Sequence, residues 1–152
     1  MKIRVEIDPE ISENELVIRC NQIDESVTAI QNILLNSDSR KKKIVFFKDE
    51  TEFYLAADEV LFYETSDNMV WAHTKEDEFQ VKYKLYELER MMPEYFVRVS
   101  KSTILNTKKV YSIQKNLAAA SRVEFYDSHK IVYVSRSYYK GLKEKLSLGI
   151  GE

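Results

Sequence analysis

Two segments in the C-terminal half of the chain carry side chains of the types that contact nucleic acid. The first, residues 96–109, spaces polar side chains among apolar ones, and the polar ones include Arg98, Ser100, Lys101, Ser102 and Asn106. The second, residues 134–140, contains Ser135, Arg136, Ser137 and Lys140. Arginine and lysine suit guanine in the major groove, asparagine suits adenine, and serine suits phosphate oxygens. Taken alone, each segment is explained equally well as an ordinary solvated loop.

The distribution of charge adds a reason to consider nucleic acid. The net charge of the whole chain is only −2. However, residues 1–95 carry 12 Lys and Arg against 21 Asp and Glu, whereas residues 96–146 carry 11 against three. A basic half of this kind is a recognised hint of contact with nucleic acid or a membrane surface.

No pattern typical of an enzyme or a metal site is found. His73 and His129 fall in different predicted hairpins, and neither has a partner at metal-ligand or catalytic-triad spacing. Cys20 is the only cysteine and lies in an apolar run, which excludes an intramolecular disulfide and favours a buried, unreactive thiol. The only glycines are at positions 141, 149 and 151, so there is no glycine-rich phosphate loop. We therefore expect no catalytic residues, no metal and no cofactor.

The elements that must position the polar side chains are mostly strands. Apolar or alternating runs between polar turns predict strands at residues 44–47, 52–55, 60–64, 70–74, 79–83, 110–114, 122–126 and 130–135. Short helices are predicted at residues 85–92, where Pro93 ends the helix, and from near residues 135–137 until the glycines at 149 and 151 end it. The fold class is therefore mainly β with short helices (α+β), and the polar stretch 100–102 is a loop.

Residues 1–40 are predicted to form a separate small β-β-α unit. Residues 2–8 alternate apolar and charged side chains, and residues 15–20 give a second strand. A helix follows from Asp24, a suitable N-cap, with Val27, Ile30 and Leu34 on one face. We expect domains at 1–40 and 41–152, and we hypothesise that the first supports dimerisation.

The N-terminus indicates a protein without a targeting segment. Charged residues begin at Lys2, which leaves no room for the apolar core of a signal peptide. No apolar stretch approaches the ~20 residues that a membrane-spanning helix needs. We therefore expect a cytoplasmic protein.

Four motifs together point to a family. They are residues 61–68 (LFYETSDN), 83–89 (YKLYELE), 96–106 (FVRVSKSTILN) and 134–138 (VSRSY). In this order, residues 44–146 resemble the LytTR DNA-binding domain of bacterial response regulators and stand-alone regulators. Each motif is loose alone, but the ordered set makes the match specific.

The resemblance implies an elongated β-sheet domain that binds repeated promoter half-sites. Loop residues of the family enter successive major grooves and bend the DNA. By motif, the implied DNA contacts here come from three regions: Asn68 and Met69; Ser100, Lys101 and Ser102; and Arg136, Ser137 and Lys140. Two features depart from the family: about forty residues cannot hold a receiver domain before the motifs, and Asp67 makes the first region acidic.

The leading hypothesis is a sequence-specific regulator that binds double-stranded DNA, as a homodimer at least on DNA. The alternative is a non-enzymatic protein-interaction module, for instance an antagonist that docks on a partner through its acidic N-terminal half. An unidentified regulatory protein partner is open under either hypothesis.

Overall fold

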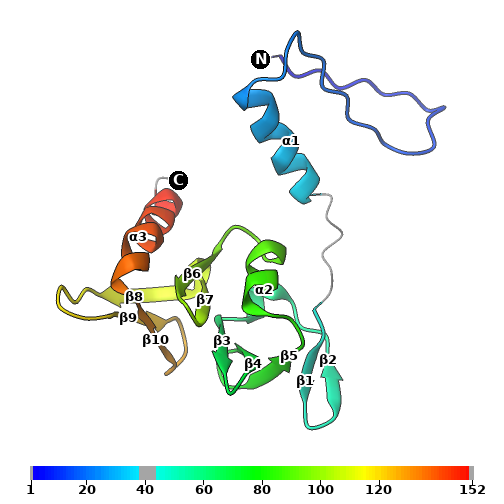
Figure 1. The fold of residues 1–152 in the computed structure, drawn as a ribbon. Coiled ribbons are helices and arrows are strands. Elements are labelled where there is room, and N and C mark those ends of the chain that lie inside the picture. The colour runs from blue at the N-terminus through cyan, green and yellow to red at the C-terminus, as the bar shows by residue number, and fades with distance from the viewer. Residues whose placement is uncertain (1, 38–43, 151–152) are drawn as a thin grey trace. The chain divides into compact units, whose positions relative to one another are not determined.

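The computed structural model describes residues 2–37 and 44–150 (Figure 1). The chain divides into two compact units, Met1–Lys41 and Lys42–Glu152. Among the described residues, one helix lies in the first unit, and all of the strands lie in the second.

Helix α1 (Glu25–Ser37) is the regular element of the N-terminal unit. Asp24 caps it as predicted, because its Oδ1 accepts hydrogen bonds from the Ser26 hydroxyl at 2.7 Å and the Val27 amide at 2.9 Å. The bonds from Ser26 and Val27 lower the pKa of the Asp24 carboxyl. A carboxylate in this position satisfies an amide that has no partner within the helix.

The two strands predicted before α1 are not formed, since no residue from 2 to 24 belongs to a strand. Every side chain in that range is exposed, including Ile3, Val5 and Ile7. A period of two determines which side chains share a face, but it does not supply the neighbouring strand that the backbone must pair with. Cys20, predicted to be buried, is exposed because it lies in the same segment.

Seven antiparallel strands form the larger sheet of the second unit, in the order β2-β1-β5-β4-β3-β7-β6. They are β1 (Phe46–Lys48), β2 (Thr51–Phe53), β3 (Phe62–Ser66), β4 (Met69–His73), β5 (Glu78–Val81), β6 (Phe96–Ser100) and β7 (Thr103–Asn106). The first five lie where the sequence predicts strands. The sequence does not predict the last two, because the polar side chains spaced through residues 96–106 are typical of loops.

A three-stranded sheet and the helices complete the unit. The sheet is β10-β9-β8, with β8 (Val110–Gln114), β9 (Ser121–Phe125) and β10 (Ile131–Val134). The helices are α2 (Leu85–Met91), α3 (Arg136–Ile150) and the 3-10 turns η1 (Ala57–Glu59) and η2 (Thr107–Lys109). The prediction of a mainly β fold with short helices is confirmed.

Strands β3 and β7 separate two hydrophobic cores. Phe62 pairs with Leu105 and Tyr63 with Ile104, and successive residues of a strand point to opposite faces. Tyr63 and Ile104 therefore enter the core that α2 closes, whereas Phe62 and Leu105 enter the core shared with the second sheet and with Leu142 of α3. Both faces of this pair are buried at Phe62, Tyr63 and along β7, whereas Thr65 and Ser66 at the end of β3 are exposed.

Candidate nucleic-acid interface

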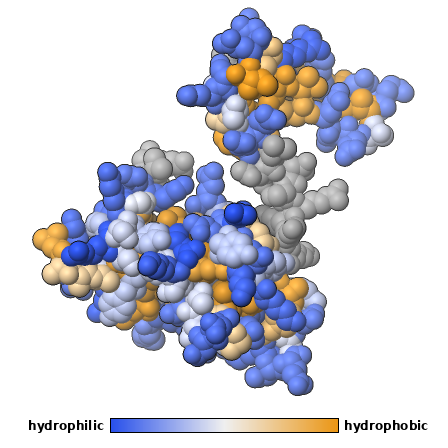
Figure 2. Space-filling model, viewed as in Figure 1, coloured by the Kyte–Doolittle hydropathy of each residue, from blue (hydrophilic) through white to orange (hydrophobic). Residues whose placement is uncertain are grey.

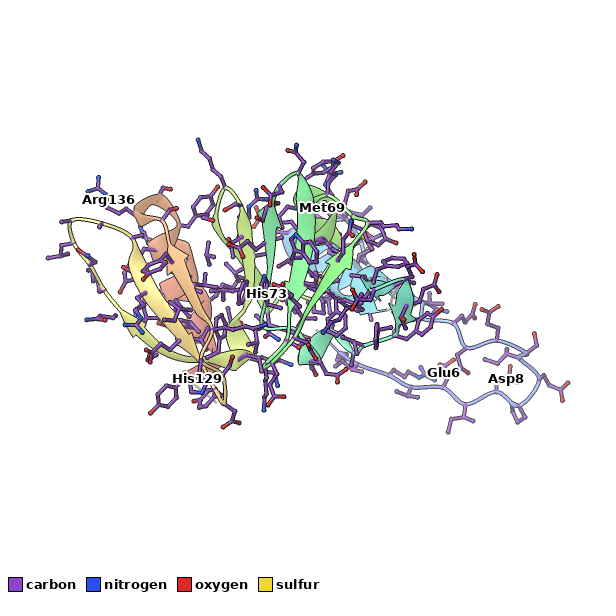
Figure 3. All side chains as sticks on the ribbon, turned by 90° about the horizontal axis from the view of Figure 1, so that it is seen from below. Glu6, Asp8, Met69, His73, His129 and Arg136 are labelled. Carbon is purple, nitrogen blue, oxygen red and sulfur yellow. The ribbon has the colours of Figure 1, made fainter. Side chains whose placement is uncertain are left out.

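Three exposed regions lie together at one edge of the second unit: the β3–β4 turn, the β6–β7 turn and the junction of β10 with α3. The first two adjoin because the Thr65 amide donates to the Ser102 carbonyl at 2.8 Å. The third joins them because the Ser135 amide donates to the Val99 carbonyl at 2.9 Å. In Figure 3, Met69 and Arg136 lie on the same side of the unit, and His129 lies on the opposite side.

The β3–β4 turn has the backbone shape that its sequence favours. Asp67 and Asn68 have φ angles of 51° and 61°, both in the left-handed region, and Ser66 pairs with Met69 across the turn. Two such residues make a tight hairpin turn, and aspartate and asparagine tolerate this conformation better than most residues. The turn leaves Asn68 and Met69 exposed at the edge.

Arg98 shapes the β6–β7 turn from within. Its Nε donates to the Ser100 carbonyl at 2.7 Å, and its Nη2 donates to the Lys101 carbonyl. The third nitrogen of the guanidinium, Nη1, donates to Glu89 Oε2 of α2 at 3.0 Å. The Ser102 amide closes the turn by donating to the Ser100 hydroxyl at 3.2 Å.

Arg98 and Lys101, which belong to the same polar segment of the sequence, therefore have different roles. The guanidinium of Arg98 is used inside the protein, so it acts on the turn and not on a ligand. Lys101 is exposed at the tip of the same turn. The sequence alone does not predict that Arg98 holds the turn, because this role depends on the β6–β7 hairpin that brings the Ser100 and Lys101 carbonyls to its guanidinium.

The third region is the N-terminus of α3. Ser135 precedes the helix, and its carbonyl accepts hydrogen bonds from the amides of Tyr138 and Tyr139 at 2.9 and 3.1 Å. Arg136, Ser137 and Lys140 are exposed on the first turns. A helix N-terminus attracts anions, and residues four apart share a helix face, so Arg136 and Lys140 reinforce each other there.

The cations at this edge are available to an external anion. Among residues 2–37 and 44–150, no ion pair involves Lys101, Arg136 or Lys140. By contrast, Arg98 and Arg122 are both paired with glutamates at 3.0 Å. The acidic residue at the edge is Asp67, in the β3–β4 turn.

Asn106 does not belong to the interface, and its prediction as a DNA contact is wrong. Its side chain is fully buried at the end of β7. Its Nδ2 donates to the Val60 carbonyl at 3.0 Å, and its Oδ1 accepts from the Lys108 amide at 3.0 Å. The amide therefore satisfies backbone groups of the core.

The histidines lie away from this edge. His73 stacks on Phe62 with ring centroids 4.3 Å apart, and burial lowers its pKa to about 4, helped by the charge of Lys130. His129 is exposed in the turn after β9. Within the part of the chain that the structure describes, no group of three or more His, Cys, Asp or Glu could hold a metal ion. The helices of that part are too short or too polar to cross a membrane.

Comparisons with known proteins place the chain among DNA-binding relatives. The family model for the LytTr DNA-binding domain matches residues 50–147. Proteins of Staphylococcus aureus strains NCTC 8325, COL and MRSA252, each named an uncharacterized HTH-type transcriptional regulator, are 30% identical over 151 residues, covering 97% of this chain and 99% of each relative.

A solved structure supports the fold. A LytTr DNA-binding domain from Bacillus cereus has a TM-score of 0.63 and 21% identity, covering 69% of this chain and 97% of that domain. In the described part of this chain, α1, α2 and α3 are separated from one another by strands. The exposed edge consists of two turns between strands and the N-terminus of α3.

Proposed function

This chain belongs to the LytTR DNA-binding domain family, and from that premise we propose that it is a cytoplasmic, sequence-specific regulator that reads repeated half-sites in double-stranded promoter DNA. The strand turns and the start of α3 would enter successive major grooves. The observation that carries the proposal is the gathering of three exposed regions at one edge, with Lys101, Arg136 and Lys140 outside every ion pair of the described residues.

Lys101 and Arg136 are the proposed base readers. Lys101 extends from a turn whose carbonyls are held by Arg98, so its starting point is fixed. Arg136 is the first residue of α3, and its planar fork matches the two acceptors of guanine in the major groove. At the neighbouring turn, Asn68 offers an amide suited to adenine, and Met69 offers an apolar contact.

The remaining residues of the edge are proposed to hold phosphates. Ser100, Ser102 and Ser137 carry hydroxyl groups, and Lys140 adds a charge one turn into α3. Contacts of this kind fix the position of a protein on the duplex without reading its sequence. The amides of the first turn of α3 favour the same ligand.

Single substitutions separate reading from anchoring. We expect Lys101→Ala and Arg136→Ala each to weaken binding to the best site by about 1–3 kcal/mol and to flatten the preference at one or two base pairs. Lys143 is exposed further along α3 and provides the matched control. Lys143→Ala should weaken all sequences alike and lower the salt slope by about one unit at most.

The assay is competition between a site selected from random double-stranded DNA and a scrambled site, repeated over a range of salt. If Lys101→Ala and Arg136→Ala lose general affinity but keep the wild-type preference, both residues are phosphate contacts and the assignment is wrong. A wild-type protein that binds without sequence preference, or that prefers single-stranded RNA, would overturn the proposed function itself.

Repeated half-sites call for two copies of the chain. We therefore propose that the regulator acts as a homodimer on DNA, with the N-terminal unit (residues 1–40) as the dimerising part. Substitutions in the DNA-reading edge should then leave self-association unchanged.

A further inference from the structure

The beginning of the chain exposes a row of apolar side chains that no described residue covers. Ile3, Val5 and Ile7 are 91%, 83% and 91% exposed, and they alternate with charged residues. Apolar surface is visible on the N-terminal unit in Figure 2. Exposed apolar side chains that gather in this way mark a surface for a partner.

We propose that residues 2–8 pair with the same residues of a second copy, as antiparallel strands about a two-fold axis at Val5. The segment reads Lys-Ile-Arg-Val-Glu-Ile-Asp, which is complementary to its own reverse. The register makes four kinds of pair: Lys2 with the partner's Asp8, Ile3 with the partner's Ile7, Arg4 with the partner's Glu6, and Val5 with the partner's Val5.

Charge selects this occupant over the alternatives. Parallel pairing in register would set every charged residue against itself. Pairing within the chain, in the antiparallel register that opposes the most apolar side chains of residues 15–20, places Arg4 opposite Arg19 and Asp8 opposite Glu15. Like charges directly opposite destabilise a strand pair, whereas opposite charges stabilise it. Of these three pairings, the antiparallel pairing of two copies is the one that matches both the apolar and the charged positions.

The symmetry of the segment fits the usual form of a dimer. A two-fold interface uses the same surface on both partners, so a segment complementary to itself is what such an interface requires. A two-stranded ribbon is only marginally stable by itself. Leu16 and Ile18, which are 66% and 39% exposed, supply further apolar surface in the next segment of the same unit.

A charge swap tests the register. In the structure, Arg4 lies 2.8 Å from Glu6 of its own chain, and both side chains are largely exposed, so neither holds a core. Arg4→Glu or Glu6→Arg alone would set like charges opposite each other twice per dimer. We expect each single variant to weaken self-association of the full chain by about tenfold or more at low salt. The double variant, Arg4→Glu with Glu6→Arg, should restore it.

Disulfide cross-linking tests the axis. In a Cys20→Ser background, Val5→Cys should cross-link readily, because opposite Cα atoms lie about 4.5–5.5 Å apart, within disulfide range. Ile3→Cys should not cross-link with itself, since four residues of strand separate the two positions by about 13 Å. Mixing Ile3→Cys with Ile7→Cys chains should produce a cross-linked heterodimer.

Sedimentation of the full chain without DNA measures the first test, and non-reducing electrophoresis measures the second. A wild-type monomer, a double swap that stays as weak as the single variants, or equal cross-linking at positions 3 and 5 would each overturn the proposed pairing. Because no DNA is present, these outcomes are independent of the proposed DNA-reading function.

Discussion

Replacing Asn106 with alanine tests whether this side chain supports the fold or reads DNA. The amide satisfies the Val60 carbonyl and the Lys108 amide, each at 3.0 Å. Val60 is fully buried, so its carbonyl would lose its side-chain partner away from water, whereas Lys108 is exposed and its amide can bond to solvent. A buried polar group left without a partner costs about 1–3 kcal/mol.

The expected loss of unfolding free energy is therefore about 2–4 kcal/mol, since the small cavity left by the amide adds to the unpaired carbonyl. Urea unfolding followed by fluorescence measures it, because Trp71 is the only tryptophan and lies in β4 of the same sheet. Ser102→Ala is the control, in the β6–β7 turn at the other end of β7. That side chain is exposed, and its replacement should change the stability by less than about 0.5 kcal/mol.

The DNA measurement completes the test. Folded Asn106→Ala protein should keep the wild-type order of preference among DNA sites. A stability loss below about 1 kcal/mol, together with a changed preference at one base pair, would refute the assignment of Asn106 to the core.

Two further predictions concern Arg98, in the β6–β7 hairpin, and His73, at the end of β4. Arg98→Lys keeps a charge near Glu89 but loses the fork that holds the Ser100 and Lys101 carbonyls, so it should flatten the preference at the same base pairs as Lys101→Ala. Additive losses in a double-mutant cycle with Lys101→Ala would contradict this link. The pKa of His73 is lowered to about 4 in the folded protein, so as the pH falls this imidazole is protonated in the unfolded chain before it is protonated in the folded one. The stability that is present above about pH 6.5 is therefore lost as the pH falls toward 4. A shift of this size corresponds to at most about 3 kcal/mol; burial is its main cause, Lys130 adds to it, and Glu78 opposes it. Urea titrations at pH 7.5 and 4.5 should show a smaller difference for His73→Gln than for wild type, and equal differences would contradict the prediction.

Local signals were enough to predict most of the secondary structure. The β3–β4 turn is an example, because Asp67 and Asn68 both adopt the left-handed backbone that their types tolerate. Asp24 is another, because its side chain caps α1 through its neighbours in sequence. In both cases the cause lies within a few residues, so the sequence pattern contains it.

The role of a side chain that depends on a partner far away in the sequence could not be predicted in the same way. Asn106 and Arg98 have the chemistry to contact a base or to satisfy a backbone carbonyl, and the choice depends on which strand lies beside them. The pairing of β3 with β7 brings the Val60 carbonyl to Asn106, and the β6–β7 hairpin brings the Lys101 carbonyl to Arg98. The strand predicted at residues 2–8 is not formed for a related reason. Its alternating pattern needs a neighbouring strand to pair with, and the described chain does not provide one.

The two-sided burial of β3 and β7 has a consequence for how DNA recognition can vary. All four residues of β7 are buried, and β3 begins with Phe62 and Tyr63 in opposite cores. Close packing on both faces makes this pair stiff, so the turns at its end are positioned before DNA arrives. The side chains at the tips, such as Lys101, contribute little to that packing because they are exposed. Exchanging a tip residue should therefore change which base pairs are preferred while leaving the unfolding free energy nearly constant, and exchanging a buried residue of β7 such as Asn106 should do the reverse.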